Sequence, residues 1–241
     1  VAPMPRHRPL AALLATAAIC AGVVLYAYGR GLAAKSIPEQ LTDREFWSMV
    51  DSFSEPNGYF RSDNLLSNEN AYQRVIPALQ STLAPGGVYL GVGPEQNFTY
   101  LAALRPRIAF IVDIRRGNLL QHLLYKALFE LSADRAEFLA RLFSMPKLTG
   151  VTATSTAREL FDAVYRQTSD KALFEANTRQ VLALLTGTHK FALSIDDEAQ
   201  LTWIYGCFFT YGPDLTYQRC ESGSGRGFGG RGGGRFGGER F

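Results

Sequence analysis

The stretch GGVYLGVGPEQNFTYLAALRPRIAFIVDIRR, residues 86–116, contains two apolar runs separated by a glycine turn and a helical pattern. The β-forming residues at 88–90 lie between two glycine clusters and predict a short buried strand. The apolar run over 108–114 predicts a second strand, with Asp113 near its carboxyl end. A strand, a glycine turn, a helix, a strand and an acid in this order form the first half of a nucleotide-binding βαβ unit.

The turn Gly91-Val-Gly93 lets a ligand approach the backbone, because glycine has no side chain to obstruct it. Pro94 suits the first position of a helix, since its fixed φ fits and its missing N–H costs nothing there. We therefore expect a helix from Pro94 to about Pro106. A right-handed connection would then make strands 88–92 and 108–113 adjacent and parallel.

The glycine motif departs from two common cofactor loops. A dinucleotide fingerprint has a third glycine where this chain has Gln96, and a methyltransferase loop usually has an acid and a glycine where Tyr89 and Glu95 stand. The charge of Glu95 suits a helix N-terminus but repels phosphate. A ligand with an amino group and a ribose, such as S-adenosylmethionine, therefore fits better than a pyrophosphate cofactor. The alternative is that the glycines serve packing alone.

In the ligand-binding interpretation, Asp113 accepts both hydroxyls of the ribose and the 91–97 loop holds the methionine end. No general base and no metal site are predicted, so the sequence assigns no catalytic residue. Asp196 and Asp197 could form a metal or acid/base pair, but helix capping by Ser194 and Asp197 explains the pattern. The expected cofactor-binding residues are Gly91, Gly93, Glu95, Asn97, Asp113 and Arg115.

The chain of 241 residues is 46% hydrophobic and 20% charged, as expected of a globular domain rather than a disordered one. Its formal charge of +3 does not by itself imply a nucleic-acid partner. The cysteines at 20, 207 and 220 are too few and too scattered for a disulfide framework or a zinc site.

Residues 10–29 contain no charged side chain and follow Arg6 and Arg8. Such a segment can cross a bilayer, and the basic flank favours export of the remaining chain. We expect an uncleaved membrane anchor with the domain on the extracytoplasmic side. A signal peptide cleaved after Ala33 and a buried soluble helix are the alternatives.

Residues 223–238 are rich in glycine and arginine, which allows three interpretations. They could form an RNA-binding tail, a flexible tail, or a glycine loop before further sheet in a chain that is cut short. RNA binding conflicts with export. We expect truncation, because a doubly wound sheet normally has more than the two strands that the sequence indicates.

Residues 57–70 are dense in hydrogen-bonding side chains and either line a site or form ordinary turns. Ser67 is expected to cap a helix through Tyr72 and Leu79, and Thr42 with Glu45 resembles a capping box. His122 and Lys126 are interpreted as structural. Other helices are expected over 40–54, 119–131, 133–143, 156–165, 170–185 and 194–211.

The region 41–217 resembles an uncharacterised family of bacterial proteins with a methyltransferase-like fold. The resemblance is carried by SDNLLSNE at 62–69, YLGVGPEQNFTYLAALRPR at 89–107, FIVDIRRGNLLQHLLYKALFELSADRAEF at 110–138, GPDLTY at 212–217 and GRGGGRF at 230–236. It implies a helix-rich α/β domain with an incomplete, Rossmann-like parallel sheet, and a C-terminal truncation.

The expected organisation is a basic flank with a membrane anchor or signal helix over 1–35, the α/β domain over 36–217 and a flexible segment over 218–241. The expected function is that of a membrane-anchored, methyltransferase-like protein with S-adenosylmethionine as its cofactor. The alternative is an exported, non-catalytic protein that binds another small ligand on the same fold.

Overall fold

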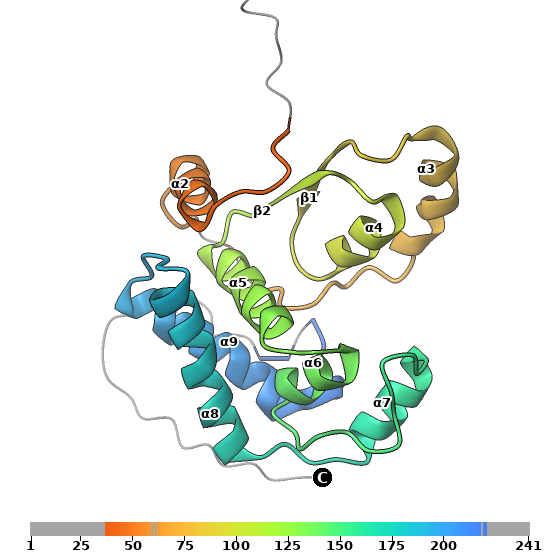
Figure 1. Cartoon of the computed structure of the whole chain (residues 1–241), viewed down its shortest axis with the longest axis vertical. Coiled ribbons are helices and arrows are strands. Elements are labelled where there is room, and N and C mark those ends of the chain that lie inside the picture. The colour runs from red at the N-terminus through yellow and green to blue at the C-terminus, as the bar shows by residue number, and fades with distance from the viewer. Residues whose placement is uncertain (1–36, 59, 61, 218, 221–241) are drawn as a thin grey trace, which may run out of the picture. The chain divides into compact units, whose positions relative to one another are not determined.

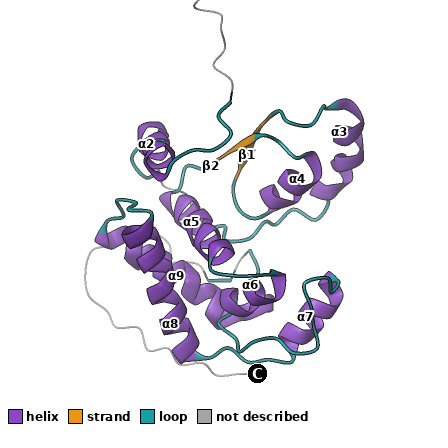
Figure 2. Cartoon of the chain, in the orientation of Figure 1, coloured by secondary structure: helices purple, strands orange, loops and turns teal. Residues whose placement is uncertain are grey.

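A computed structural model describes residues 37–58, 60, 62–217, 219 and 220. The chain divides into two units, Val1–Gln40 and Leu41–Phe241, and the elements below all belong to the second. That unit is a helix-rich α/β domain with a small parallel sheet (Figures 1 and 2). The described part of the chain contains no helix that is long and apolar enough to cross a membrane. The anchor expected over 10–29 and the segment 223–238 lie outside it.

The sheet confirms the predicted pair of adjacent, parallel strands. β1 (Val88–Val92) pairs with β2 (Ile108–Val112) in a register that aligns Val88 with Ile108 and Val92 with Val112. The connecting helix α4 (Gln96–Leu104) begins two residues later than predicted. It ends where Arg105 adopts a left-handed conformation with φ of 49°.

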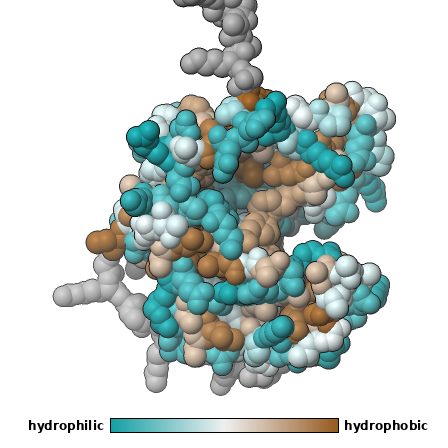
Figure 3. All heavy atoms as spheres, in the orientation of Figure 1, coloured by the Kyte–Doolittle hydropathy of each residue, from teal (hydrophilic) through white to brown (hydrophobic). Residues whose placement is uncertain are grey.

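One face of the sheet carries apolar side chains that no other described element covers fully. Alternate residues of a strand share a face, and in β1 Val88, Leu90 and Val92 are 55%, 75% and 66% exposed. Val112 of β2, aligned with Val92, is 57% exposed. Figure 3 shows apolar side chains at the surface of the part of the chain that contains the sheet.

The core lies in the helices that follow the sheet. α5 (Arg116–Glu130) packs along α9 (Ile195–Tyr211), with α6 (Arg135–Leu142) and α8 (Lys171–Leu182) against them. The two long helices run parallel, because Arg116 contacts Asp197 near their N-termini and Tyr125 packs on Phe208 farther along. The completely buried side chains include Leu120, Leu124, Leu128, Val164, Val181, Leu185, Leu201 and Ile204.

Local capping signals predicted the starts of two helices. Thr42 with Glu45 and Ser194 with Asp197 form the predicted capping boxes of α2 (Asp43–Phe53) and α9. The expected cap at Ser67 is wrong: the first helical turn after it follows Ala71 and has no side-chain cap. The remaining elements are η1 (Tyr72–Val75), α3 (Ile76–Thr82), α7 (Ala157–Tyr165), the π-helix η2 (Ala183–Thr188) and η3 (Gly212–Asp214).

Two of the three cysteines form a disulfide, Cys207–Cys220. The sequence analysis predicted no disulfide framework, and this single bond between Cys207 and Cys220 was not anticipated. Cys207 lies in α9, and the chain turns back after Gly212, whose φ of 53° ends the helix. The reversal brings Cys220 next to Cys207, an arrangement that the spacing of the cysteines alone does not indicate.

Candidate functional site

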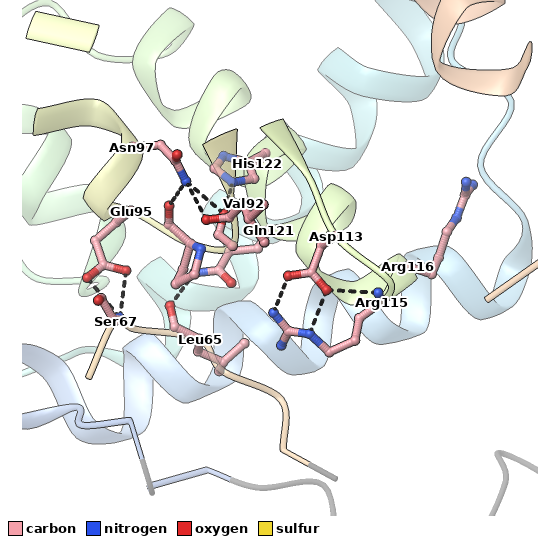
Figure 4. A network of polar contacts seen from close by, with 12 residues as sticks. Leu65, Ser67, Val92, Glu95, Asn97, Asp113, Arg115, Arg116, Gln121 and His122 are labelled. Carbon is pink, nitrogen blue, oxygen red and sulfur yellow. Dashed lines mark hydrogen bonds and ion pairs between the residues drawn. The ribbon is translucent and has the colours of Figure 1, made fainter. Parts of the chain in front are cut away.

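The loop between β1 and α4 is closed by the side chain of Asn97 (Figure 4). Asn97 is 1% exposed, and its Nδ2 donates to the carbonyls of Val92, Gly93 and Pro94 at 3.2, 3.1 and 2.7 Å. Its Oδ1 accepts from the hydroxyl of Tyr89 at 2.8 Å. The hydroxyl of Tyr89 in β1 therefore helps to fix the side chain that closes the loop.

The two predicted glycines have different roles in this loop. A Cβ on Gly91 would lie 2.0 Å from Asn97 Oδ1 and 2.5 Å from the ring of Tyr89, so this glycine makes room for the two side chains. Gly93 has φ of 82°, a conformation that favours glycine, and a Cβ there would meet no atom within 4 Å. Gly91 therefore serves packing, whereas the space beside Gly93 is open.

His122 of α5 connects the loop to the helical core. Its Nε2 lies 3.0 Å from the carbonyl oxygen of Gly93, and a carbonyl only accepts, so Nε2 carries the proton. Burial lowers the pKa of His122, opposed by this hydrogen bond and by the charge of Asp113. His122 is thus kept neutral at pH 7 and acts as a structural donor, in agreement with the interpretation from the sequence.

Glu95 lies at the start of α4 and contacts the 62–67 segment. Both carboxylate oxygens accept from the backbone N–H of Ser67, at 3.1 and 3.2 Å. Burial raises the pKa of Glu95, although the hydrogen bond from Ser67 opposes the rise. The charge of Glu95 also adds to the rise that burial causes in the pKa of the Tyr125 hydroxyl.

Asp113, just after β2, forms a two-pronged ion pair with Arg115. Arg115 Nε donates to Oδ1 at 3.0 Å and Nη2 donates to Oδ2 at 2.8 Å, while the backbone N–H of Arg115 donates to Oδ1 at 2.9 Å. Both side chains are 9% exposed. The guanidinium also lies 5.9 Å from the ring centroid of Phe60.

Polar residues from the 57–70 region lie against the carboxyl ends of both strands. Gly58 N–H donates to the carbonyl of Ile114 at 2.9 Å, and Asn57 Oδ1 accepts from the N–H of Arg116 at 2.7 Å. Gln121 Nε2 of α5 donates to the carbonyl of Leu65 at 2.5 Å. These hydrogen bonds attach the region to the residues that follow β2 and to α5.

Five buried side-chain oxygens in this area have no hydrogen-bond partner among the described residues. We call them the acceptor cluster: Ser62 Oγ, Asn64 Oδ1, Gln96 Oε1, Asn118 Oδ1 and Gln121 Oε1. Two belong to the 62–67 segment, one to the first residue of α4 and two to the first turns of α5. Asn118 and Gln121 were not predicted as site residues, and their only signal in the sequence is a polar side chain within an otherwise apolar helix.

Asp197 is used structurally. It closes the capping box of α9 and accepts from Arg116 Nε and Nη2 at 2.9 and 3.0 Å. Burial raises its pKa, but the bonds from Arg116 and Ser194 outweigh burial and lower it. Within the described residues, no three His, Cys, Asp or Glu side chains come together as metal ligands.

Of the predicted site residues, Gly91 lies within β1 and the other five follow the two strands. Gly93, Glu95 and Asn97 follow β1, and Asp113 and Arg115 follow β2, so both groups lie at the carboxyl end of the sheet. No curated protein is significantly similar in sequence to this chain. Residues 65–203 match the sequence pattern of a protein family. The match covers more than half of the chain and most of the site. The chain belongs to the family designated "Domain of unknown function (DUF7790)".

Proposed function

We propose that the domain binds a small ligand carrying a ribose and an amino group at the carboxyl ends of β1 and β2, with S-adenosylmethionine as the compound to test. The main support for this proposal is that Glu95 and Asp113 follow two adjacent parallel strands. Ligands of open α/β sheets bind at the carboxyl ends of such strands. We take β1, α4 and β2 as the first unit of a Rossmann-like sheet. The domain would be anchored to a membrane through residues 10–29.

The ion pair at Asp113 sets a condition on this binding. A carboxylate offers about four lone-pair positions, and Arg115 already uses three of them. The single remaining lone-pair position cannot accept hydrogen bonds from both hydroxyls of a ribose. Ribose binding therefore requires the guanidinium of Arg115 to leave at least one carboxylate oxygen, and Phe60 offers it a neighbouring aromatic face.

Methyl transfer is the reaction that fits such a site best. It depends mainly on alignment of the two reactants, so a site without a general base suffices. Glu95 would pair with the amino group of the cofactor, and its negative charge would disfavour a phosphate at the same place. No described residue is assigned a catalytic role.

Calorimetry with S-adenosylmethionine tests the proposal. Asp113→Asn keeps the shape of the side chain but removes its charge, so affinity should fall about ten-fold or more. Glu95→Gln should also weaken this ligand, yet strengthen a phosphate-bearing one such as NAD. Glu159→Gln, which alters the exposed cap of α7, is the control and should have no effect. Equal binding by wild type and Asp113→Asn would contradict the placement of the ribose.

The disulfide favours a second candidate, an exported protein that binds a small ligand without catalysis. Disulfides persist mainly in oxidising compartments, and Cys207–Cys220 lies within the domain. S-adenosylmethionine is a cytoplasmic metabolite that an exported domain would rarely meet. A reporter enzyme fused after Tyr217 separates the two: activity of an export-dependent reporter supports this candidate, and activity of a cytoplasm-dependent one supports the methyltransferase.

A further inference from the structure

We infer that the acceptor cluster is a ligand subsite that binds a hydrogen-bond-donating group, either an ammonium or a set of hydroxyls. The inference rests on the proposed function. It adds binding residues outside the glycine loop and states which kind of ligand group they would bind. It concerns Asn118 and Gln121 of α5, Gln96 of α4 and the 62–67 segment.

The orientation of Gln121 is determined by its neighbours. Nε2 donates to the carbonyl of Leu65 and to the hydroxyl of Tyr125 at 2.5 and 2.9 Å, so the opposite end of the amide must be the oxygen. The side chain is completely buried, and its Oε1 has no partner among the described residues. Oε1 is therefore a fixed acceptor within the protein.

The other members of the cluster are brought to Gln121 by the fold. Asn118, 2% exposed, lies three residues earlier on the same side of α5. Asn64 precedes Leu65, whose carbonyl Gln121 binds, and Gln96 follows Glu95, which binds Ser67. Asn64 and Gln96 are thus each within one residue of a contact that ties the 62–67 segment to α4 or α5, and Asn118 lies on the same side of α5 as Gln121.

Such a concentration is unusual, because buried polar groups in native proteins nearly always have a partner. Asn64 also adopts a left-handed backbone conformation, with φ of 47°. All five atoms can accept a hydrogen bond, and Glu95 adds a carboxylate beside them. The guanidinium of Arg115, which follows β2, is engaged by Asp113. The subsite therefore suits a donor group and disfavours a phosphate or a carboxylate.

Asn118→Leu and Gln96→Met test the inference, since both keep the approximate shape of the side chain. Neither amide makes a side-chain hydrogen bond in the described structure, so without ligand the melting temperature should stay the same or rise. If the oxygens bind a ligand, affinity should nevertheless fall about ten-fold. Asn177→Leu is the control: this buried amide accepts from Arg141 Nη1 at 3.4 Å, so the melting temperature should fall while affinity is unchanged.

Calorimetry on the full chain would use four probes: S-adenosylmethionine, adenosine, methionine and spermidine. Adenosine has hydroxyls but no ammonium, and spermidine has ammonium groups but no hydroxyl. Comparing the two therefore shows which donor group the subsite binds. If methionine or spermidine binds in an Asn118-dependent manner and neither nucleoside does, the proposed function fails and the subsite stands. If a nucleoside binds wild type and both variants equally, the subsite is overturned and the proposed function stands. If no probe binds wild type, the oxygens hold ordered water only and the inference is overturned.

Discussion

The helical part and the sheet of this domain differ sharply in how well they are buried. Leu124 of α5 and Ile204 of α9 are completely inaccessible, whereas Leu90 of β1 is 75% exposed. Parallel sheets are normally covered on both faces, so the helices form a finished core and the described sheet does not. The candidate site lies at the boundary, where His122 of the helical part binds the carbonyl of Gly93. The site residues thus come from the sheet and its loops, and the helical part fixes these loops in place.

The largest expected effect comes from removing a core side chain. Leu124→Ala should reduce the free energy of unfolding by about 2–5 kcal/mol, because it removes buried apolar atoms and leaves a cavity. Leu90→Ala should change it by less than about 0.5 kcal/mol, since that side chain is already mostly in water. Denaturant unfolding measures both. Similar losses for the two variants would mean that the exposed face of the sheet is covered in solution.

A smaller effect is expected in the loop of the sheet. Gly91→Ala places a methyl group 2.0 Å from Asn97 Oδ1 and should cost about 1–3 kcal/mol, as overpacking does. Gly87→Ala is the matched control, because a Cβ there meets nothing within 4 Å. Calorimetric melting compares them. If the two variants are equally stable, Asn97 does not hold the loop closed as described.

At the edge of the helical core, the ion pairs of His189 are expected to depend on pH. His189 Nε2 lies 2.7 Å from Glu130 of α5 and Nδ1 lies 2.9 Å from Asp43 of α2, with Lys126 paired to Glu130. Burial lowers the pKa of His189, but the two carboxylates outweigh burial and raise it. The stabilisation is therefore complete below the unfolded pKa of about 6.5 and is lost as pH rises through the higher folded value.

Fluorescence of Trp47 can follow this loss, because its ring stacks on Phe191 at 5.0 Å beside His189. In a Trp203→Phe background, the emission of Trp47 should change modestly as pH rises from about 6 to 8. His189→Gln should abolish the change. If the emission of Trp47 still changes with pH in His189→Gln, groups other than His189 cause the change.

The smallest change in stability is expected from a charge on the open face. Leu90→Lys should alter the free energy of unfolding by less than about 0.5 kcal/mol, yet reduce self-association, because an exposed apolar strand invites edge-to-edge pairing. Light scattering against concentration measures the association. If the wild-type chain is monodisperse at all concentrations, the exposed face does not associate and the prediction is wrong.

Local patterns predicted the elements, and contacts distant in sequence were missed. The strands and the cap at Thr42 were predictable because β-propensity and capping act over a few residues. Ser67 looked equally like a cap, but its N–H is taken by Glu95, 28 residues away. Gln121 gave only the weak signal of a polar residue in an apolar helix. The bond that Arg115 makes to Asp113 is local, yet no propensity rule distinguishes it from a free ribose-binding acid.

The π-helix η2 has a consequence for how α2 is attached to the core. The N–H of His189 donates to the carbonyl of Leu184 at 2.9 Å, five residues back, so the last turns hold more residues than an α-helix would. One residue turns an α-helix by about 100°. Deleting one residue from 183–188 would therefore rotate His189 away from both Asp43 and Glu130. The two ion pairs of His189 therefore depend on the π-helical geometry of 183–188, whereas the packing of Trp47 on Phe191 holds α2 by apolar contact.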